Sequence, residues 1–218
     1  MHSGKRFHTD LRDMFGRAKS PLPRIQADED LVLRAVTPSD DEQLYVMIES
    51  NRWHLEPWLS WIEDIHTLQD TRKFLKSVSY KSIYAGGWVF GIEFQGQLVG
   101  LMDLNEGNHH DRFIALGYWL DADAEGQGLI TKTVISCMNY LFEEQNVRKV
   151  LIKCATNNVR SEAIPKRLGF TWDGISYNAG MVQEQSVDLV KYSMTKTDWT
   201  QWKRTYPHTQ SNEKDEKR

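Results

Sequence analysis

The sequence predicts an α+β domain built on a mixed, mostly antiparallel sheet flanked by helices. Three observations indicate this class. The chain opens with a strand pattern and two helical patterns, three strand patterns then follow one another through short connections, and a glycine-containing turn leads into a long amphipathic helix. The full order, βααβββαβαββ, lacks the regular alternation of strands and helices that a doubly wound nucleotide-binding fold requires.

Length and composition limit the possible functions. The chain has 218 residues, of which 40% are hydrophobic and 26% charged, and its formal net charge is −3. This size suits one well-buried core, and the charge offers no broad cationic surface for nucleic acid. No apolar run reaches the roughly 18 residues that span a bilayer, and the polar start lacks the apolar core of a signal peptide. We therefore expect a cytoplasmic protein with neither nucleic acid nor membrane as partner.

The domain organisation follows from the two ends of the chain. Residues 30–200 show continuous patterning, whereas residues 1–29 form an N-terminal extension and residues 201–218 a C-terminal tail rich in charge. Cys137 lies within a helical pattern and Cys154 at a strand end, without metal-type spacing. We interpret both as reduced, buried thiols.

The first third of the domain is expected to be a strand followed by two helical regions. Residues 31–36 alternate as a strand, and residues 37–40 provide cap and first-turn chemistry for a helix that ends near Glu49. A tryptophan-rich segment, 53–61, precedes a second helix over 67–80.

The remaining elements surround the glycine turn. Gln95 and Gly96 form a two-residue hairpin turn between the first two of three antiparallel strands. The expected strands are 88–94, 97–104, 113–120, 149–154, 170–175 and 187–194. The expected helices are 129–145 and 161–168, the second closed by Gly169. Pro165 has no N–H to donate to the Ser161 carbonyl, so this helix is expected to loosen there.

The turn at Gly126 and Gly128 is the first candidate site. Glycine permits unusual backbone angles, and the helix that follows presents free N–H groups and a partial positive charge, which together favour an anion such as pyrophosphate. The alternative is ordinary turn chemistry. The third glycine of a dinucleotide fingerprint is missing, and the chain contains no P-loop motif, so the sequence supports neither of these nucleotide sites.

Four short runs then give a resemblance to a known family. They are LGYWL at 116–120, EGQG at 125–128, NVRS at 158–161 and RLGF at 167–170. In order and spacing these runs resemble the Gcn5-related N-acetyltransferases (GNAT), and more narrowly the Rim-type branch, which acetylates the N-termini of ribosomal proteins. The resemblance covers residues 30–198 and includes the tryptophan-rich segment.

The resemblance implies acetyl-CoA as cofactor. The phosphate-binding signature of the family, [QR]-x-x-G-x-[GA], matches residues 123–128 except at Asp123, an acid that we expect to face solvent or to cap the helix. In the family, the strand before the turn splays from its neighbour and its free backbone groups pair with the pantetheine arm. The residues implied at the cofactor are Trp119, Leu120, Gly126, Gln127, Gly128, Leu129, Ile130, Thr131, Asn158 and Ser161.

The resemblance also implies catalytic roles, although with departures. Ser161 matches a serine near the thioester sulfur and is the candidate acid, while capping a helix remains its alternative with Asn158. Ala115 and Gly180, the latter placed in a loop, stand where relatives often carry glutamate. Our candidate base is Asp103, at the end of a strand that should border the site; an exposed strand-end carboxylate is the alternative.

Several other residues have both a functional and a structural interpretation. Tyr118 and Tyr177 are candidates for a polar contact or core aromatics. The segment 109–111, His-His-Asp, is interpreted as a solvated turn because no third ligand is spaced suitably. The tryptophans of 53–61 are interpreted first as core packing, with a peptide-binding wall or a stacking surface as alternatives.

The sequence thus favours an acetyl-CoA-dependent N-acetyltransferase acting on an α-amine, most plausibly a protein N-terminus. An α-amine has a pKa of about 8, so a weak base suffices for it more readily than for lysine at about 10.4. Two alternatives stay open: a small amine, antibiotic or aminoacyl-nucleotide as acceptor, and an acyl-CoA-binding module without turnover. Dimerisation is common in similar proteins, so a homodimer is a further hypothesis.

Overall fold

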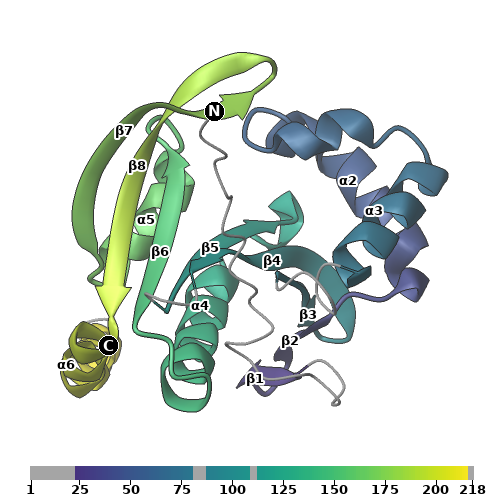
Figure 1. The fold of residues 1–218 in the computed structure, drawn as a ribbon. Helices are drawn as coiled ribbons and strands as arrows, with labels where there is room; N and C mark the ends of the chain where they lie inside the picture. The colour runs from purple at the N-terminus through teal and green to yellow at the C-terminus, as the bar shows by residue number, and fades with distance from the viewer. Residues whose placement is uncertain (1–22, 81–86, 109–111, 216–218) are drawn as a thin grey trace.

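The computed structural model describes residues 23–80, 87–108 and 112–215. The strands are β1 (Ile25–Asp28), β2 (Leu31–Ala35), β3 (Trp88–Phe94), β4 (Gln97–Asn108), β5 (Phe113–Leu120), β6 (Lys149–Ala155), β7 (Thr171–Val182) and β8 (Gln185–Thr195). They form an eight-stranded sheet in the order β1-β2-β3-β4-β5-β6-β8-β7 (Figure 1). Neighbouring strands are antiparallel except β5 and β6, which confirms the predicted mixed, mostly antiparallel α+β fold.

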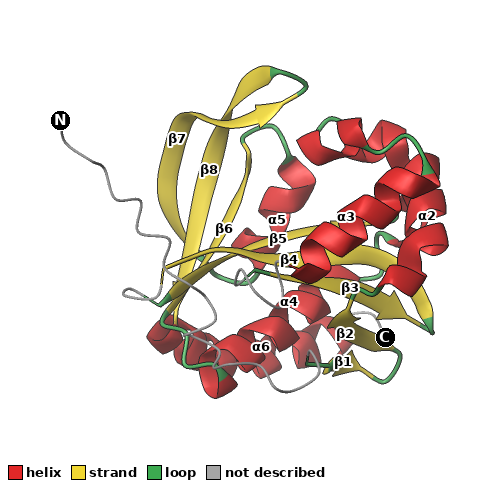
Figure 2. Ribbon diagram, turned by 45° about the vertical axis from the view of Figure 1, so that its right-hand side comes forward, coloured by secondary structure: helices red, strands yellow, loops and turns green. Residues whose placement is uncertain are grey.

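Helices cover both faces of this sheet, as Figure 2 shows. The helices are α2 (Asp41–Leu55), α3 (Leu68–Tyr80), α4 (Leu129–Asn139), α5 (Val159–Arg167) and α6 (Lys196–Asp215). Short helical turns are η1 (Pro38–Asp40), η2 (Ser60–Asp64), η4 (Ala122–Ala124) and η5 (Tyr140–Glu144), the last a π-turn that extends α4.

The two faces carry separate apolar clusters. On one face, α2 and α3 pack Leu44 and Leu75 against side chains such as Leu101 and Trp119. On the other face, α4, α5 and α6 lie against a larger cluster that includes Leu116 and other alternate residues of β5. Because successive side chains of a strand point to opposite faces, β5 contributes to both clusters and forms the centre of the core.

A helix connects the one parallel pair of strands. Parallel neighbours need a crossover, and α4 provides it between β5 and β6. The N-terminus of α4 therefore lies beside the end of β5, close to the edge where β5 and β6 end. This connection brings the glycine turn and the β5–β6 edge together.

Several boundaries differ from the sequence-based expectation. Helix α2 continues to Leu55, beyond the expected end near Glu49, and β1 was not predicted. Strands β7 and β8 form one long hairpin rather than two short strands around a loop. The expected tail from residue 201 begins inside α6, where Trp202 stacks on buried Trp199 at a centroid distance of 4.6 Å. Local patterning misses these extensions because tertiary contacts stabilise them.

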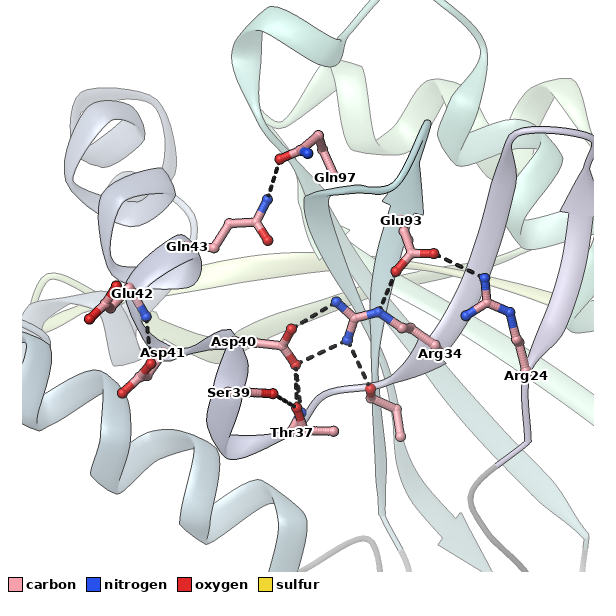
Figure 3. A network of polar contacts seen from close by, with 11 residues as sticks. Arg24, Arg34, Thr37, Ser39, Asp40, Asp41, Glu42, Gln43, Glu93 and Gln97 are labelled. Carbon is pink, nitrogen blue, oxygen red and sulfur yellow. Dashed lines mark hydrogen bonds and ion pairs between the residues drawn. The ribbon is translucent and has the colours of Figure 1, made fainter.

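An ion-pair network fixes the start of α2 to the sheet (Figure 3). Arg34 Nη2 on β2 donates to Asp40 Oδ1 at 2.7 Å, and its Nε donates to Glu93 Oε2 on β3 at 2.6 Å. Asp40 also accepts the Thr37 N–H at 2.6 Å, and Arg24 pairs with Glu93 at 3.0 Å. Burial alone would raise the pKa of Asp40, but the bonds from Arg34 and Thr37 outweigh it and lower the pKa.

Removal of Asp40 tests this network. We expect Asp40→Ala to lower the free energy of unfolding by about 2–4 kcal/mol, because Arg34 loses a partner in a partly buried position. Denaturant unfolding followed by circular dichroism measures the change. Glu42→Ala, at an exposed position in the first turn of α2, is the matched control, with an expected change below about 1 kcal/mol. Equal losses in the two variants would contradict the assignment.

Candidate active site

The glycine turn has the geometry of an anion site. Gly126 and Gly128 adopt φ values of 77° and 72°, a region that favours glycine, and Gly128 is the N-cap of α4. No atom lies within 4 Å of a Cβ built on either glycine, so backbone conformation rather than crowding requires them. Lys132 donates to the Gly128 carbonyl at 3.1 Å, which leaves the three preceding N–H groups of α4 without intrahelical acceptors.

Two side chains accept hydrogen bonds from the backbone at the start of this turn. Asn51 of α2, only 3% exposed, accepts the Ala122 N–H at 2.8 Å through Oδ1 and donates to the Met47 carbonyl at 2.9 Å. Asp121 accepts the Asp123 N–H at 3.0 Å and caps η4. The Asp123 side chain is exposed, as expected from its unfavourable charge, while Asp121 supplies the cap.

Polar side chains from α2 and α5 meet at the same turn. Glu125 pairs with His54 Nε2 of α2 at 2.9 Å and with Arg160 Nη1 of α5 at 2.9 Å. Arg167, in the last turn of α5, donates to Thr131 Oγ1 at 2.9 Å. Two guanidinium groups therefore flank the free N–H groups of α4.

The opening between β5 and β6 begins beside this turn. The two strands pair from Phe113 with Lys149 to Leu116 with Ile152. Beyond that point β5 stays paired with β4 as far as Leu120, and β6 stays paired with β8 as far as Ala155. The facing edges of residues 117–120 and 153–155 thus part from each other, which confirms the splay that the family resemblance implied. Trp119 and Leu120 lie on this open edge of β5.

Ser161 lies on one side of the opening, in the first turn of α5. Asn158 Oδ1 accepts the Ser161 N–H at 3.1 Å, so the expected capping role is present. The Tyr118 hydroxyl on β5 donates to the Ser161 carbonyl at 2.9 Å. Burial raises the pKa of the Cys154 thiol to about 11, and a hydrogen bond with the Ser161 side chain partly offsets this rise. Ser161, Tyr118 and Cys154 therefore form one cluster on the α4–α5 face.

Asp103 lies on the opposite face of the sheet, near the point where β5 and β6 part. It pairs across β4 and β5 with Gly117, the first residue after the β5–β6 pairing ends. A Cβ on Gly117 would lie 2.2 Å from Asp103 Oδ1, so only glycine leaves room for this carboxylate. Asn105 Nδ2 donates to Asp103. Although Asp103 is partly exposed, desolvation of its carboxylate raises its pKa to about 6.

The other predicted residues have mixed outcomes. Tyr177 on β7 is 74% exposed and Trp53 is 72% exposed, so the interpretation as a core aromatic is wrong for both. Trp61 does pack as expected, stacking on Phe74 at a centroid distance of 4.6 Å. Gly180 lies within β7 rather than in a loop, where a Cβ would meet Val187 at 2.9 Å.

Ala115 and the two cysteines are buried in the structure. Ala115 lies in β5, and both cysteines are free. Segment 109–111 lies outside the described residues. Among the described residues no group of three His, Cys, Asp or Glu side chains could hold a metal ion.

Sequence reasoning missed Asn51, His54, Arg160 and Arg167. Arg160 and Arg167 occur within the motifs at 158–161 and 167–170, but their contacts depend on how α5 lies beside α4. Asn51 and His54 are three residues apart on α2, so they share a helix face. That spacing is the only local signal for the pair.

Comparison with known proteins identifies the family of this chain. The family model described as an acetyltransferase (GNAT) domain matches residues 30–171. The chain belongs to the GNAT acetyltransferase family. The putative ribosomal N-acetyltransferase YdaF of Bacillus subtilis (strain 168) is 31% identical over 176 residues, which cover 80% of this chain and 96% of that relative.

Other GNAT relatives point the same way. The ribosomal-protein-serine acetyltransferase of Escherichia coli (strain K12) is 27% identical over 171 residues, which cover 78% of this chain and 94% of that relative. The solved RimL, a ribosomal L7/L12 α-N-protein acetyltransferase in complex with coenzyme A, shares this fold with a TM-score of 0.74. That structure is 24% identical, and the match covers 79% of this chain and 98% of that one.

Within residues 23–80, 87–108 and 112–215, no helix combines the length and apolar character needed to cross a bilayer.

The contact of Asn51 with the turn predicts an effect on cofactor binding. Asn51→Leu removes the acceptor for the Ala122 N–H with little change in volume. We expect CoA to bind about 5- to 20-fold more weakly, because one hydrogen bond that fixes the turn is lost. Isothermal titration with CoA measures the change. Gln43→Ala, on α2 but directed at Gln97, is the control and should bind CoA as the parent does.

The raised pKa of Asp103 predicts that its ionised carboxylate destabilises the folded protein. Its pKa in the folded protein, about 6, exceeds the ordinary value of 3.8. Folding therefore favours the neutral form, and this stabilisation is full below about pH 4 and is lost as the pH rises through 6. We expect Asp103→Asn to melt about 2–4 °C above the parent at pH 8, with a smaller difference at pH 5.

Melting curves of both proteins at the two pH values provide the measurement. The exposed Asp123→Asn is the matched control and should show no pH-dependent difference from the parent. A D103N protein less stable than the parent at pH 8 would contradict the desolvation of this carboxylate.

Proposed function

We propose that this chain transfers the acetyl group of acetyl-CoA to the α-amine of a protein N-terminus, with ribosomal proteins as the substrate class. The observation that carries the proposal is the position of Asp103 over Gly117, at the level where β5 and β6 part. The names of two curated relatives, a putative ribosomal N-acetyltransferase and a ribosomal-protein-serine acetyltransferase, support the substrate class. The reaction would take place in the cytoplasm, where ribosomal proteins are made.

In this proposal the cofactor extends from the glycine turn into the opening. The backbone N–H groups of residues 127–131 bind the pyrophosphate, and the partial positive charge of α4 favours it. The pantetheine arm pairs with the open edge of β5 at Trp119 and Leu120. The Asn158 amide group binds the same arm while its oxygen caps α5.

The reaction joins the amine nitrogen to the acetyl carbon and breaks the bond between that carbon and the CoA sulfur. The nitrogen must lose a proton and the sulfur must gain one. Asp103 accepts the amine proton from the α2–α3 face, and the Ser161 hydroxyl donates a proton to the sulfur from the opposite face. Proton exchange with solvent then returns both side chains to their starting forms. The transfer is direct, within a ternary complex.

The pKa of Asp103 favours an α-amine over a lysine side chain. A carboxyl group with a pKa of about 6 lies about two units below an α-amine at about 8. It lies more than about four units below lysine at about 10.4. Each unit opposes proton transfer by about 1.4 kcal/mol, so an α-amine is the better matched acceptor.

An acetylation assay tests the proposed function. We expect incubation with acetyl-CoA to acetylate peptides with a free N-terminus, whereas N-terminally blocked peptides containing lysine stay unmodified, with mass spectrometry detecting the product. We expect Asp103→Asn and Ser161→Ala each to lower kcat by about 10²-fold. In the parent, kcat/KM should rise with pH through about 6 as Asp103 ionises, and D103N should lose this limb.

Two outcomes would overturn the proposal. Acetylation of small amines but not of peptides would identify a small-molecule acetyltransferase. CoA binding without turnover of any peptide or amine would identify an acyl-CoA-binding module.

A further inference from the structure

The Ser161 carbonyl has an unusual hydrogen-bond donor. In a regular helix this carbonyl would accept the N–H of the residue four positions on, but that residue is Pro165, which has no N–H. Helix α5 nevertheless continues through Pro165 to Arg167, so the expected loosening does not break it. The Tyr118 hydroxyl, from β5, supplies the missing donor at 2.9 Å.

Side chains from outside the regular helix ladder therefore hold both backbone polar groups of Ser161. Its N–H, which lies in the first turn and has no intrahelical acceptor, donates to Asn158 Oδ1 at 3.1 Å. Its carbonyl accepts from Tyr118. The backbone from which the Ser161 hydroxyl projects is thus fixed from both sides, between the helix cap and the central strand.

Tyr118 is poorly suited to act as an acid itself. Burial raises the pKa of its hydroxyl, and the nearby Cys154 raises it further, while the Ser161 side chain only partly offsets the rise. Its proton is also directed at a backbone carbonyl, 43 residues away in the sequence. This hydroxyl is therefore committed to a contact that orders Ser161.

We propose that Tyr118 is a positioning residue for Ser161, and that Pro165 makes it necessary by leaving the Ser161 carbonyl without its helical donor. The proposal rests on the proposed role of Ser161 as the acid for the departing thiolate. It assigns Tyr118 an effect on turnover through the Ser161 backbone, without a proton transfer from Tyr118 itself.

A double-variant comparison tests this assignment. We expect Tyr118→Phe to lower kcat about tenfold, a fraction of what a general acid contributes, while KM for acetyl-CoA changes less than about twofold. Pro165→Ala restores an N–H four residues after Ser161. In the P165A background, Y118F is therefore expected to lower kcat less than about twofold, because the helix now supplies the donor.

A second tyrosine provides the matched control. Tyr192 on β8 also donates to α5, to Glu162 Oε1 at 2.7 Å, but it does not touch the Ser161 carbonyl. Any effect of Tyr192→Phe should therefore be the same with and without P165A. In the Ser161→Ala background, Y118F should cause no further loss of kcat, since the group it positions is gone.

Thermal unfolding of the proteins without ligand tests the contact independently of turnover. Y118F should melt about 2–4 °C below the parent, and the loss should be smaller between P165A and the double variant. Failure to acetylate any acceptor would remove the proposed function but leave this comparison readable. Equal effects of Y118F on kcat and melting in both backgrounds, or additive losses with S161A, would overturn the positioning role.

Discussion

The parting of β5 and β6 after Leu116 is the constraint on which the site depends. A paired edge would consume the backbone groups of residues 117–120 that face β6, whereas the open edge leaves them available. Both strands remain hydrogen-bonded there, because each keeps its other neighbour. The opening is therefore part of the sheet itself.

The same opening gives access to two chemically different faces. Asp103 lies on the face covered by α2 and α3, where Gly117 leaves room for its carboxylate. Ser161 lies on the face of α4 and α5, held by Asn158 and Tyr118. A group inserted between the strands would thus meet a carboxylate from one side and a hydroxyl from the other, which suits the proposed transfer, because that transfer moves protons at both ends of the bond change.

Helix α2 covers one face of the sheet and also contacts the glycine turn, which begins α4 on the other face. Asn51 bonds to the Ala122 backbone, and His54 pairs with Glu125, which in turn pairs with Arg160 of α5. The turn is therefore held by α2 at Ala122 and by both α2 and α5 at Glu125. These contacts fix the glycine turn relative to the opening.

The sequence by itself determined the α+β class, the order of the seven strands from β2 to β8, the glycine turn, and the pairing of Asn158 with Ser161, since periodicity, turn chemistry and capping are local properties. It also supplied Asp103 as a candidate, but not the raised pKa, which comes from desolvation over Gly117. Tertiary structure alone decided that Tyr118 meets the Ser161 carbonyl, that α2 holds the turn, that Trp53 is exposed, and that α6 packs its aromatic residues on the core. The contacts of Tyr118 with Ser161 and of Asn51 with Ala122 join residues far apart in the chain, and the packing of helices on the two faces of the sheet sets their distances.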